Sequence, residues 1–308
     1  MICCPLCAGT TAKEVERIPY SQIWLALADV WKARFTKEVI NRHTPGKETR
    51  LLECQQCGLQ FFVGAVPGDD EFYRELTITS DAYYSEDKWD FKEAAKVILP
   101  NDKVLDIACG TGTFLQIIKA KGYDAVGIDT NPAAINMACT NGLSAYCVAL
   151  ADFASSHAGC FDSVTAFQVI EHIAELRPFI HSALTCLKPG GKLLLTVPNR
   201  QRSFRDAFEP LDCPPHHLTR WSGTQFTALA NIFGCRVIDL RFETARMHDC
   251  RALLRNKVSV NSNKSLWTRF IARVVFAPTL YSFYARWGLL KRWDLWGMSI
   301  MCVLEKPR

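Results

Sequence analysis

Strand-like and helix-like segments alternate through the middle of this chain, and this alternation constrains the fold more than any other feature. Short aliphatic runs predict strands at 103–107, 125–128, 163–167, 192–197 and 236–241. Apolar residues at helical spacing predict helices at 113–121, 132–141, 176–187 and 223–233. Strands that alternate with helices assemble into a mostly parallel sheet covered on both faces. We therefore expect a doubly wound α/β fold.

The composition excludes several classes of protein. Apolar residues make up 49% of the 308 residues, enough to bury a substantial core, so global disorder is excluded. No run of about 18 uncharged apolar residues predicts a membrane-spanning helix. The first residues lack the basic and apolar pattern of a signal peptide. We expect a cytoplasmic protein, whose 14 cysteines are thiols or metal ligands rather than disulfides.

The pattern divides the chain into three regions. Residues 1–68 hold two cysteine pairs, a helical stretch over 21–40 and a strand-like run at 59–63. Residues 69–245 hold the alternating segments. Residues 246–308 form an aromatic, basic and helical segment that ends in a predicted strand at 298–304.

A strand–turn–helix segment at 104–114 is the most informative stretch. Gly110 and Gly112 in its turn let the backbone bend sharply and approach a ligand. The full dinucleotide-binding glycine pattern is broken, because Leu115 stands where glycine or alanine is required. Asp129 ends the next strand, 19 residues after Gly110, where a carboxylate is well placed to accept hydrogen bonds from ribose.

With two later segments, 161–173 and 187–199, this stretch resembles class I S-adenosylmethionine-dependent methyltransferases over about 70–245. The resemblance implies a Rossmann-like fold with a late antiparallel strand at 298–304. It implies that S-adenosylmethionine is the cofactor, and that the following residues bind it: Asp106, Ala108, Cys109, Gly110, Gly112, Asp129, Thr130, Asp152, Phe153 and Gln168. A nicotinamide-dependent oxidoreductase is the rival interpretation, which the broken glycine pattern disfavours.

Two cysteine pairs suggest a metal site. Cys4 and Cys7 form one C-x2-C pair, and Cys54 and Cys57 form another. Four thiolates from two tight turns give a tetrahedral site that suits a structural Zn²⁺. The 46-residue gap between the pairs is longer than usual for a zinc ribbon, Cys3 could replace Cys4, and four thiols without metal remain the alternative.

Three histidines are the candidate catalytic residues. His216 and His217 follow the strand 192–197, and His172 follows the strand 163–167. Ligands of open α/β sheets bind beyond the carboxyl ends of the strands, and histidine is a common general base for an alcohol acceptor. The alternatives are that Glu171-His172 caps the next helix and that the histidine pair only binds substrate or holds its loop.

A looser resemblance narrows the family. The cysteine pairs, the tyrosine pair Tyr83 and Tyr84, Trp89 and the Pro-Pro-His-His motif at 214–217 are similar to bacterial methyltransferases associated with surface glycans or sugars. In that group a tyrosine lines the cofactor pocket, which makes Tyr83 and Tyr84 candidates for cofactor binding. The alternative is an aromatic contact between the N-terminal region and the core.

The positive charge lies at the C-terminal end of the chain. Residues 251–308 carry 11 basic and 2 acidic side chains and four of the eight tryptophans. The segment 265–296 could contact an anionic membrane surface from the cytoplasmic side. We favour the alternative of a cap packed on the core or a homodimer contact.

Three functions compete at this point. We favour methyl transfer to a hydroxyl of a sugar, a lipid-linked glycan precursor or another small molecule. An RNA methyltransferase that uses a zinc ribbon is disfavoured, because residues 1–68 carry only 8 basic against 6 acidic side chains. The third is a protein that binds S-adenosylmethionine without catalysis.

Overall fold

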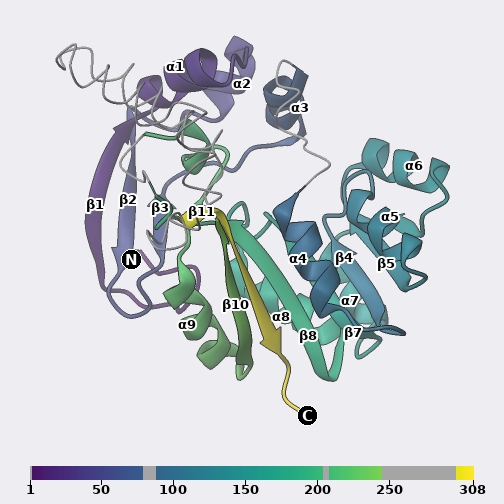
Figure 1. Cartoon of the computed structure of the whole chain (residues 1–308). Coiled ribbons are helices and arrows are strands. Elements are labelled where there is room, and N and C mark those ends of the chain that lie inside the picture. Colours follow the sequence, from purple (N-terminus) through teal and green to yellow (C-terminus); the bar gives the residue numbers. More distant parts are fainter. Residues whose placement is uncertain (1, 79–87, 204–207, 245–295) are drawn as a thin grey trace, which may run out of the picture.

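A seven-stranded sheet forms the centre of the computed structural model, which describes residues 2–78, 88–203, 208–244 and 296–308 (Figure 1). Its strand order is β10-β11-β8-β7-β4-β5-β6. The strands are β4 (Lys103–Ile107), β5 (Asp124–Asp129), β6 (Ala145–Cys147), β7 (Phe161–Phe167), β8 (Leu187–Pro198), β10 (Arg236–Thr244) and β11 (Trp296–Glu305). Strand β11 runs antiparallel to β8 and β10, and the other neighbours are parallel. The expected Rossmann-like, mostly parallel sheet is confirmed.

Helices cover both faces of this sheet because successive strand residues point to opposite sides. Leu194 of β8 packs in a cluster with α4 (Trp89–Val97) and α5 (Thr113–Ala120). Leu193 and Leu195 pack in another cluster with α7 (Leu150–Ser156), α8 (Leu176–Cys186) and α9 (Gly223–Phe233). Helix α6 (Pro132–Thr140) packs beside α5 in a smaller cluster. The fold is therefore doubly wound.

The predicted strands and helices of the core are present, with ends that shift by a few residues. The predicted helix over 21–40 is wrong as a single element. The chain forms α1 (Tyr20–Val30) and α2 (Lys37–Arg42) instead. Lys32 between them has a φ of 58°, in the left-handed region, which no continuous α-helix can contain.

A second, four-stranded sheet has the order β1-β2-β3-β9. Strands β1 (Ala12–Pro19), β2 (Glu48–Cys54) and β3 (Gln60–Val63) belong to the N-terminal region, whereas β9 (Thr219–Arg220) comes from the segment that follows β8. Gln60 pairs with Arg220, and Phe61 pairs with Thr219. A strand from the histidine-bearing segment thus completes the N-terminal sheet, and we call residues 210–221 the histidine loop.

A separate apolar cluster holds the N-terminal helices together. Trp24 of α1 packs edge-on against Phe72 of α3 (Asp70–Ile78), with ring centroids 6.2 Å apart, and Phe35 stacks on Phe72 at 5.2 Å. Leu211 of the histidine loop belongs to the same cluster. The cluster therefore crosses the predicted boundary at residue 68: helix α3 follows that boundary in the sequence but packs against the N-terminal region.

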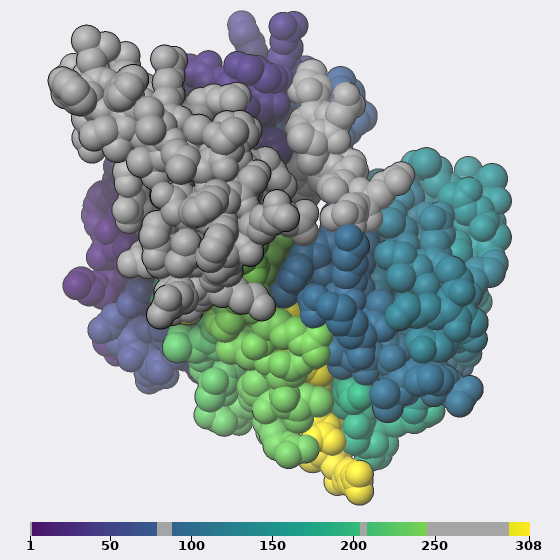
Figure 2. Space-filling view, viewed as in Figure 1, coloured from purple at the N-terminus to yellow at the C-terminus, as the bar shows by residue number. Residues whose placement is uncertain are grey.

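The carboxyl terminus lies at the lower edge of the molecule beside α9 and β10 (Figure 2). Within the described residues, no helix is long and apolar enough to cross a bilayer. The basic segment predicted at 265–296 lies, apart from Trp296, outside the described residues. Its contact with a membrane or a second copy stays a prediction.

Two leucines of α1 provide a matched test of this packing. Leu27 is 0% exposed and Leu25 is 66% exposed. We expect Leu27→Ala to lower the free energy of unfolding by about 2–5 kcal/mol, because it leaves a cavity in the cluster. Leu25→Ala should change it by less than about 0.5 kcal/mol. Urea titrations followed by tryptophan fluorescence would measure both, and equal effects would contradict the assignment of α1 to a packed core.

Candidate active site

The turn after β4 has the backbone conformation that its glycines predict. Ala108, Gly110 and Gly112 all have positive φ, of 56°, 54° and 86°. A Cβ added at Gly112 would lie 2.4 Å from Leu143 Cδ1, so only glycine fits there. A Cβ at Gly110 would meet no described atom within 4 Å, which leaves that part of the turn open to a ligand.

Asp129 holds this turn to the end of β5. Its Oδ2 accepts a hydrogen bond from Gly110 N at 2.9 Å, and its Oδ1 accepts one from Asn131 N at 2.8 Å. Thr130 stands directly beyond the strand, and Cys109 is buried between this turn and β5. The predicted ribose-binding carboxylate thus lies where the turns after β4 and β5 meet.

Asp106 is buried in β4, one strand residue before the turn begins. Its Oδ1 accepts a hydrogen bond from Thr165 Oγ1 at 2.7 Å. Burial raises the pKa of Asp106 to about 7, and the nearby Asp129 carboxylate adds to the rise. A cation bound beside Asp106 would favour its ionised form.

Gln168 follows β7 with a φ of 55° and links this edge to α4. Its Nε2 donates to Asp90 Oδ2 at 3.0 Å, and Thr196 Oγ1 donates to the same oxygen at 3.3 Å. Asp90 was not among the residues predicted from the sequence; it is buried, and that burial raises its pKa. One sequence feature could have identified it: Asp90 is an acidic residue among the apolar, buried positions of α4, the helix that precedes β4.

The remaining cofactor candidates lie in different environments. Asp152 is exposed in the first turn of α7, whereas Phe153 is buried and stacks on His157 at 3.9 Å between ring centroids. Tyr83 and Tyr84 lie outside the described residues. The cofactor roles of all these residues stay predictions.

The structure brings the three candidate histidines together. The ring centroids of His172, His216 and His217 lie 4.3 to 4.8 Å apart. His216 Nδ1 lies 2.9 Å from Leu211 O, and His172 Nδ1 lies 2.6 Å from His216 O. We call these three residues the histidine cluster.

Burial keeps the histidine cluster neutral. His216 and His217 are each 5% exposed, and the side chain of His172 is 20% exposed. Burial lowers the pKa of all three imidazoles, that of His172 to about 3. Neutral imidazoles can accept a proton or bind a metal ion.

Glu171 does not cap the following helix, which was one alternative for the Glu-His pair. Helix α8 begins at Leu176, and Glu171 is 1% exposed. Its Oε1 lies 3.7 Å from His172 Nε2, and neither carboxylate oxygen has a hydrogen-bond partner among the described residues. Burial raises the pKa of Glu171 well above its usual value.

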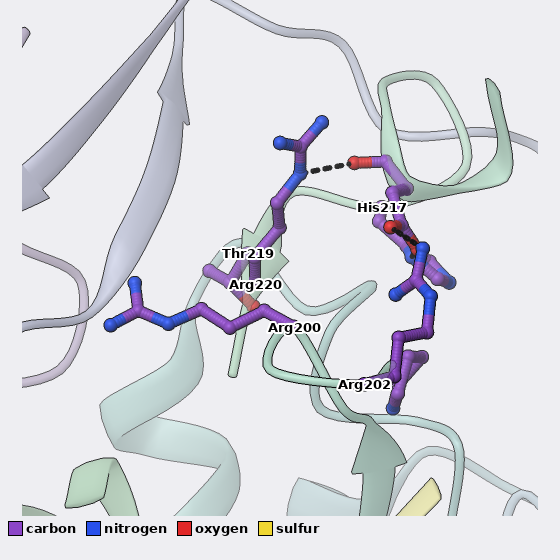
Figure 3. Close-up of a pocket in the computed structure, with 7 residues that line it drawn as sticks. Arg200, Arg202, His217, Thr219 and Arg220 are labelled. Carbon is purple, nitrogen blue, oxygen red and sulfur yellow. Dashed lines mark hydrogen bonds and ion pairs between the residues drawn. The ribbon is translucent and has the colours of Figure 1, made fainter. Parts of the chain in front are cut away.

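Three arginines line a small pocket beside the histidine cluster (Figure 3). They are Arg200, Arg202 and Arg220, and Asp212 lies between Arg202 and His217. Arg202 Nη2 donates to Asp212 Oδ2 at 2.5 Å, and Arg220 Nε donates to Asp212 O at 2.9 Å. These arginines were not predicted from the sequence, because they are scattered over about twenty residues without a recognisable spacing.

The cysteine pairs meet in two turns of the same construction. In each, the residue after the second cysteine, Ala8 or Gly58, has a positive φ and donates its N–H to the first cysteine's carbonyl at 2.9 Å. The four sulfur atoms lie within 4.8 Å of one another, and the closest pairs are 3.4 and 3.5 Å apart. A tetrahedral ZnS4 site with Zn–S of about 2.3 Å needs S···S distances of about 3.8 Å, so these residues fit a zinc ion.

Relatives with known names match the middle of the chain. The ubiquinone biosynthesis O-methyltransferase of Xanthomonas campestris pv. campestris (strain B100) is 34% identical over 113 residues, which are 35% of this chain and 47% of the relative. The protein of the same name from Chromobacterium violaceum is 31% identical over 104 residues, 32% of this chain and 45% of that protein. The chain thus spans about half the length of these relatives.

A solved structure and a family model cover more of the chain. A SAM-dependent methyltransferase from Archaeoglobus fulgidus matches 77% of this chain and 100% of its own, with a TM-score of 0.52 and 17% identity, so the likeness concerns the fold. The family model described as a methyltransferase domain matches residues 86–240, half of the chain. Because this family model matches half of the chain, the chain belongs to the methyltransferase-domain family, with the fold of class I SAM-dependent methyltransferases.

Proposed function

We propose that this protein transfers the methyl group of S-adenosylmethionine to a hydroxyl of an anionic small molecule. The observation that carries the proposal is the arrangement at one edge of the sheet. The carboxyl ends of β4, β5 and β7 bring Asp106, Asp129 and Gln168 to the same edge as the histidine cluster. A cofactor pocket beside a group that can activate a hydroxyl is what methyl transfer to oxygen requires.

The residues at this edge supply complementary chemistry. The Asp129 carboxylate can accept hydrogen bonds from ribose, and the buried acids Asp90 and Asp106 favour a sulfonium and an ammonium group nearby. The histidine cluster would activate the acceptor hydroxyl. Displacement at the methyl carbon would then proceed in line, with the sulfur as the leaving atom.

The arginine pocket favours an anionic acceptor. Arg200, Arg202 and Arg220 line it. Arg202 pairs with Asp212 and Arg200 pairs with Glu53, so an anionic acceptor would compete with these carboxylates for the guanidinium groups. Guanidinium groups bind carboxylates and phosphates bidentately. A phosphorylated sugar or glycan precursor fits this chemistry, and so does a phenol that carries a carboxylate, the second candidate suggested by the relatives named ubiquinone biosynthesis O-methyltransferase.

Methyl transfer can be tested with cofactor binding and turnover measured separately. We expect calorimetry to show binding of S-adenosylmethionine, and methyl transfer to favour phosphorylated sugars or carboxylated phenols over their uncharged analogues. His172→Ala and His217→Ala should each lower turnover by at least about 10²-fold, because activation of the hydroxyl is lost. Cofactor affinity should stay unchanged in both.

The exposed His181 on α8 provides the control, because His181→Ala should leave turnover at the wild-type rate. Normal turnover in both cluster variants would contradict the role of the histidine cluster. Cofactor binding without transfer to any acceptor would favour a non-catalytic protein.

Asp106 makes cofactor binding depend on pH. Since its pKa is about 7 without ligand, Asp106 is protonated at pH 6 and must release a proton when the cationic cofactor binds. We expect the affinity for S-adenosylmethionine to fall about tenfold from pH 8 to pH 6. Calorimetry at both pH values would measure this, and Asp106→Asn should reduce the dependence. An equal dependence in that variant would assign it to other groups.

We also propose that Cys4, Cys7, Cys54 and Cys57 bind one structural Zn²⁺. All described cysteines are free thiols, and Gly9 N and Gln56 N donate to the sulfurs of Cys7 and Cys54 at 3.4 Å each. Such N–H donors stabilise thiolates. With four protein ligands the ion would have no open position, so its role would be to hold the two turns together.

A cysteine variant pair would test the zinc site. Cys54→Ser combined with Cys57→Ser should remove one zinc per chain, measured by mass spectrometry of the metal, and should destabilise the N-terminal sheet, because zinc binding contributes to folding. Cys3→Ser is the control, since Cys3 is exposed and outside the four-sulfur group. An unchanged zinc content in the double variant would refute the site.

A further inference from the structure

The histidine cluster has the composition of a second metal site. One ring nitrogen from each of His172, His216 and His217 lies within 4.8 Å of the others. Three imidazoles that bind one ion tetrahedrally at about 2.0–2.1 Å have nitrogens about 3.3 Å apart. Small rotations of the imidazole rings would bring the nitrogens from their present separation, at most 4.8 Å, to this distance. Imidazole is a preferred ligand of divalent zinc, copper, nickel and iron.

The contacts around the rings are those that orient metal-binding histidines. A metal-ligating histidine usually donates one ring N–H to a carbonyl or carboxylate, which fixes the tautomer and the ring orientation. Nδ1 of His216 lies against Leu211 O, and Nδ1 of His172 lies against His216 O. Each ring that donates from Nδ1 has its lone pair on Nε2.

His217 has a carboxylate partner of the same kind. Asp212 Oδ1 lies 3.7 Å from His217 Nδ1, close enough for a small movement to form a hydrogen bond. Arg202 Nη2 donates to the other carboxylate oxygen of Asp212, Oδ2, at 2.5 Å, and this charged hydrogen bond stabilises the ionised carboxylate. A fixed negative charge therefore stands behind the third imidazole.

Glu171 supplies the observation that points to a cation. This carboxylate is 1% exposed, lies 3.7 Å from His172 Nε2, and has no hydrogen-bond partner for either oxygen among the described residues. Burying a carboxylate is costly unless a positive charge lies beside it.

We propose that His172, His216 and His217 bind one divalent transition-metal ion of the zinc type, with the Glu171 carboxylate balancing its charge. The ion would differ from the one at the four cysteines in both ligand type and role. Three protein ligands leave a coordination position open, whereas four thiolates close the site. Metal binding itself does not depend on the proposed methyl transfer.

The role of the ion does rest on the proposed function. An ion at the histidine cluster would bind the acceptor oxygen in its open position and lower the pKa of the hydroxyl. The O–H proton would then leave to solvent, and the oxygen would attack the methyl carbon as the S–C bond breaks. A ligated imidazole nitrogen cannot take that proton, so the three histidines would act as ligands.

The test loads the full-length protein with one equivalent of Zn²⁺, which the four thiolates bind in preference to imidazoles, and then adds Co²⁺ without S-adenosylmethionine. We expect one bound Co²⁺ per chain, with absorption bands of nitrogen and oxygen ligands and without thiolate charge-transfer bands. His172→Ala combined with His217→Ala should bind none. The control His181→Ala should bind Co²⁺ as the wild type does.

Equal Co²⁺ binding by the wild type and the double variant would overturn the proposal, and so would a spectrum showing only thiolate ligands. If circular dichroism shows that the double variant is unfolded, His172→Ala and Glu171→Gln replace it. Each should weaken Co²⁺ binding by about 10–100-fold, and unchanged affinity in both would overturn the proposal. Methyl transfer by a wild type that binds no Co²⁺ would refute the metal site alone, whereas Co²⁺ binding without cofactor binding would refute the proposed function alone.

Discussion

The pairing of the histidine loop with two separate parts of the chain fixes the candidate site. Leu218 N donates to Glu171 O at 2.8 Å, and Leu218 O accepts from Phe62 N at 2.9 Å. One residue thus joins the segment after β7 to strand β3. Because buried backbone groups must find partners, the loop cannot move from this position without leaving groups of both neighbours unsatisfied. The histidine cluster takes its geometry from this double attachment.

The N-terminal region is therefore a structural support of the site. Its cysteine turns contact the core helices directly: Arg177 of α8 donates to Leu6 O at 3.0 Å, and Gln225 of α9 donates to Cys57 O at 3.3 Å. A zinc ion at the cysteines would hold both turns against these helices. The connection then runs through β3 and β9 to His216 and His217. By our proposal, a zinc ion at the cysteines would therefore also stabilise the position of His216 and His217.

Buried acids are the common electrostatic feature of the ligand edge. Asp90, Asp106 and Glu171 come from α4, β4 and the segment after β7, and burial raises the pKa of each. Such groups cost free energy when they ionise without a partner. They favour cationic ligands, which is consistent with a sulfonium cofactor near Asp106 and, by our inference, a metal ion near Glu171. The arginines of the neighbouring pocket are, by our proposal, where an anionic acceptor binds, so the cationic cofactor and the acceptor would bind in regions of opposite charge.

The sequence by itself determined the elements of the core and the edge of the sheet that carries the candidate site. Alternating strands and helices, Gly112 in a left-handed turn and Asp129 at a strand end all carry local signals, because backbone sterics and hydrophobic periodicity act over a few residues. The parallel sheet also made it predictable that His172 and His216 would approach each other, since the carboxyl ends of parallel strands share one edge.

Only the tertiary structure decided which distant segments pair. The local sequence has no signature for the contact of β3 with β9 or for the convergence of three arginines. It also does not show that Asp90 lies beside Gln168, or that the Glu171 carboxylate has no hydrogen-bond partner among the described residues. The break between α1 and α2 also depends on tertiary contacts. The packing of Trp24 and Phe35 around Phe72 outweighs the helical periodicity of the sequence there. These features arise from contacts between residues far apart in the chain, and their free energy exists only once the chain has folded.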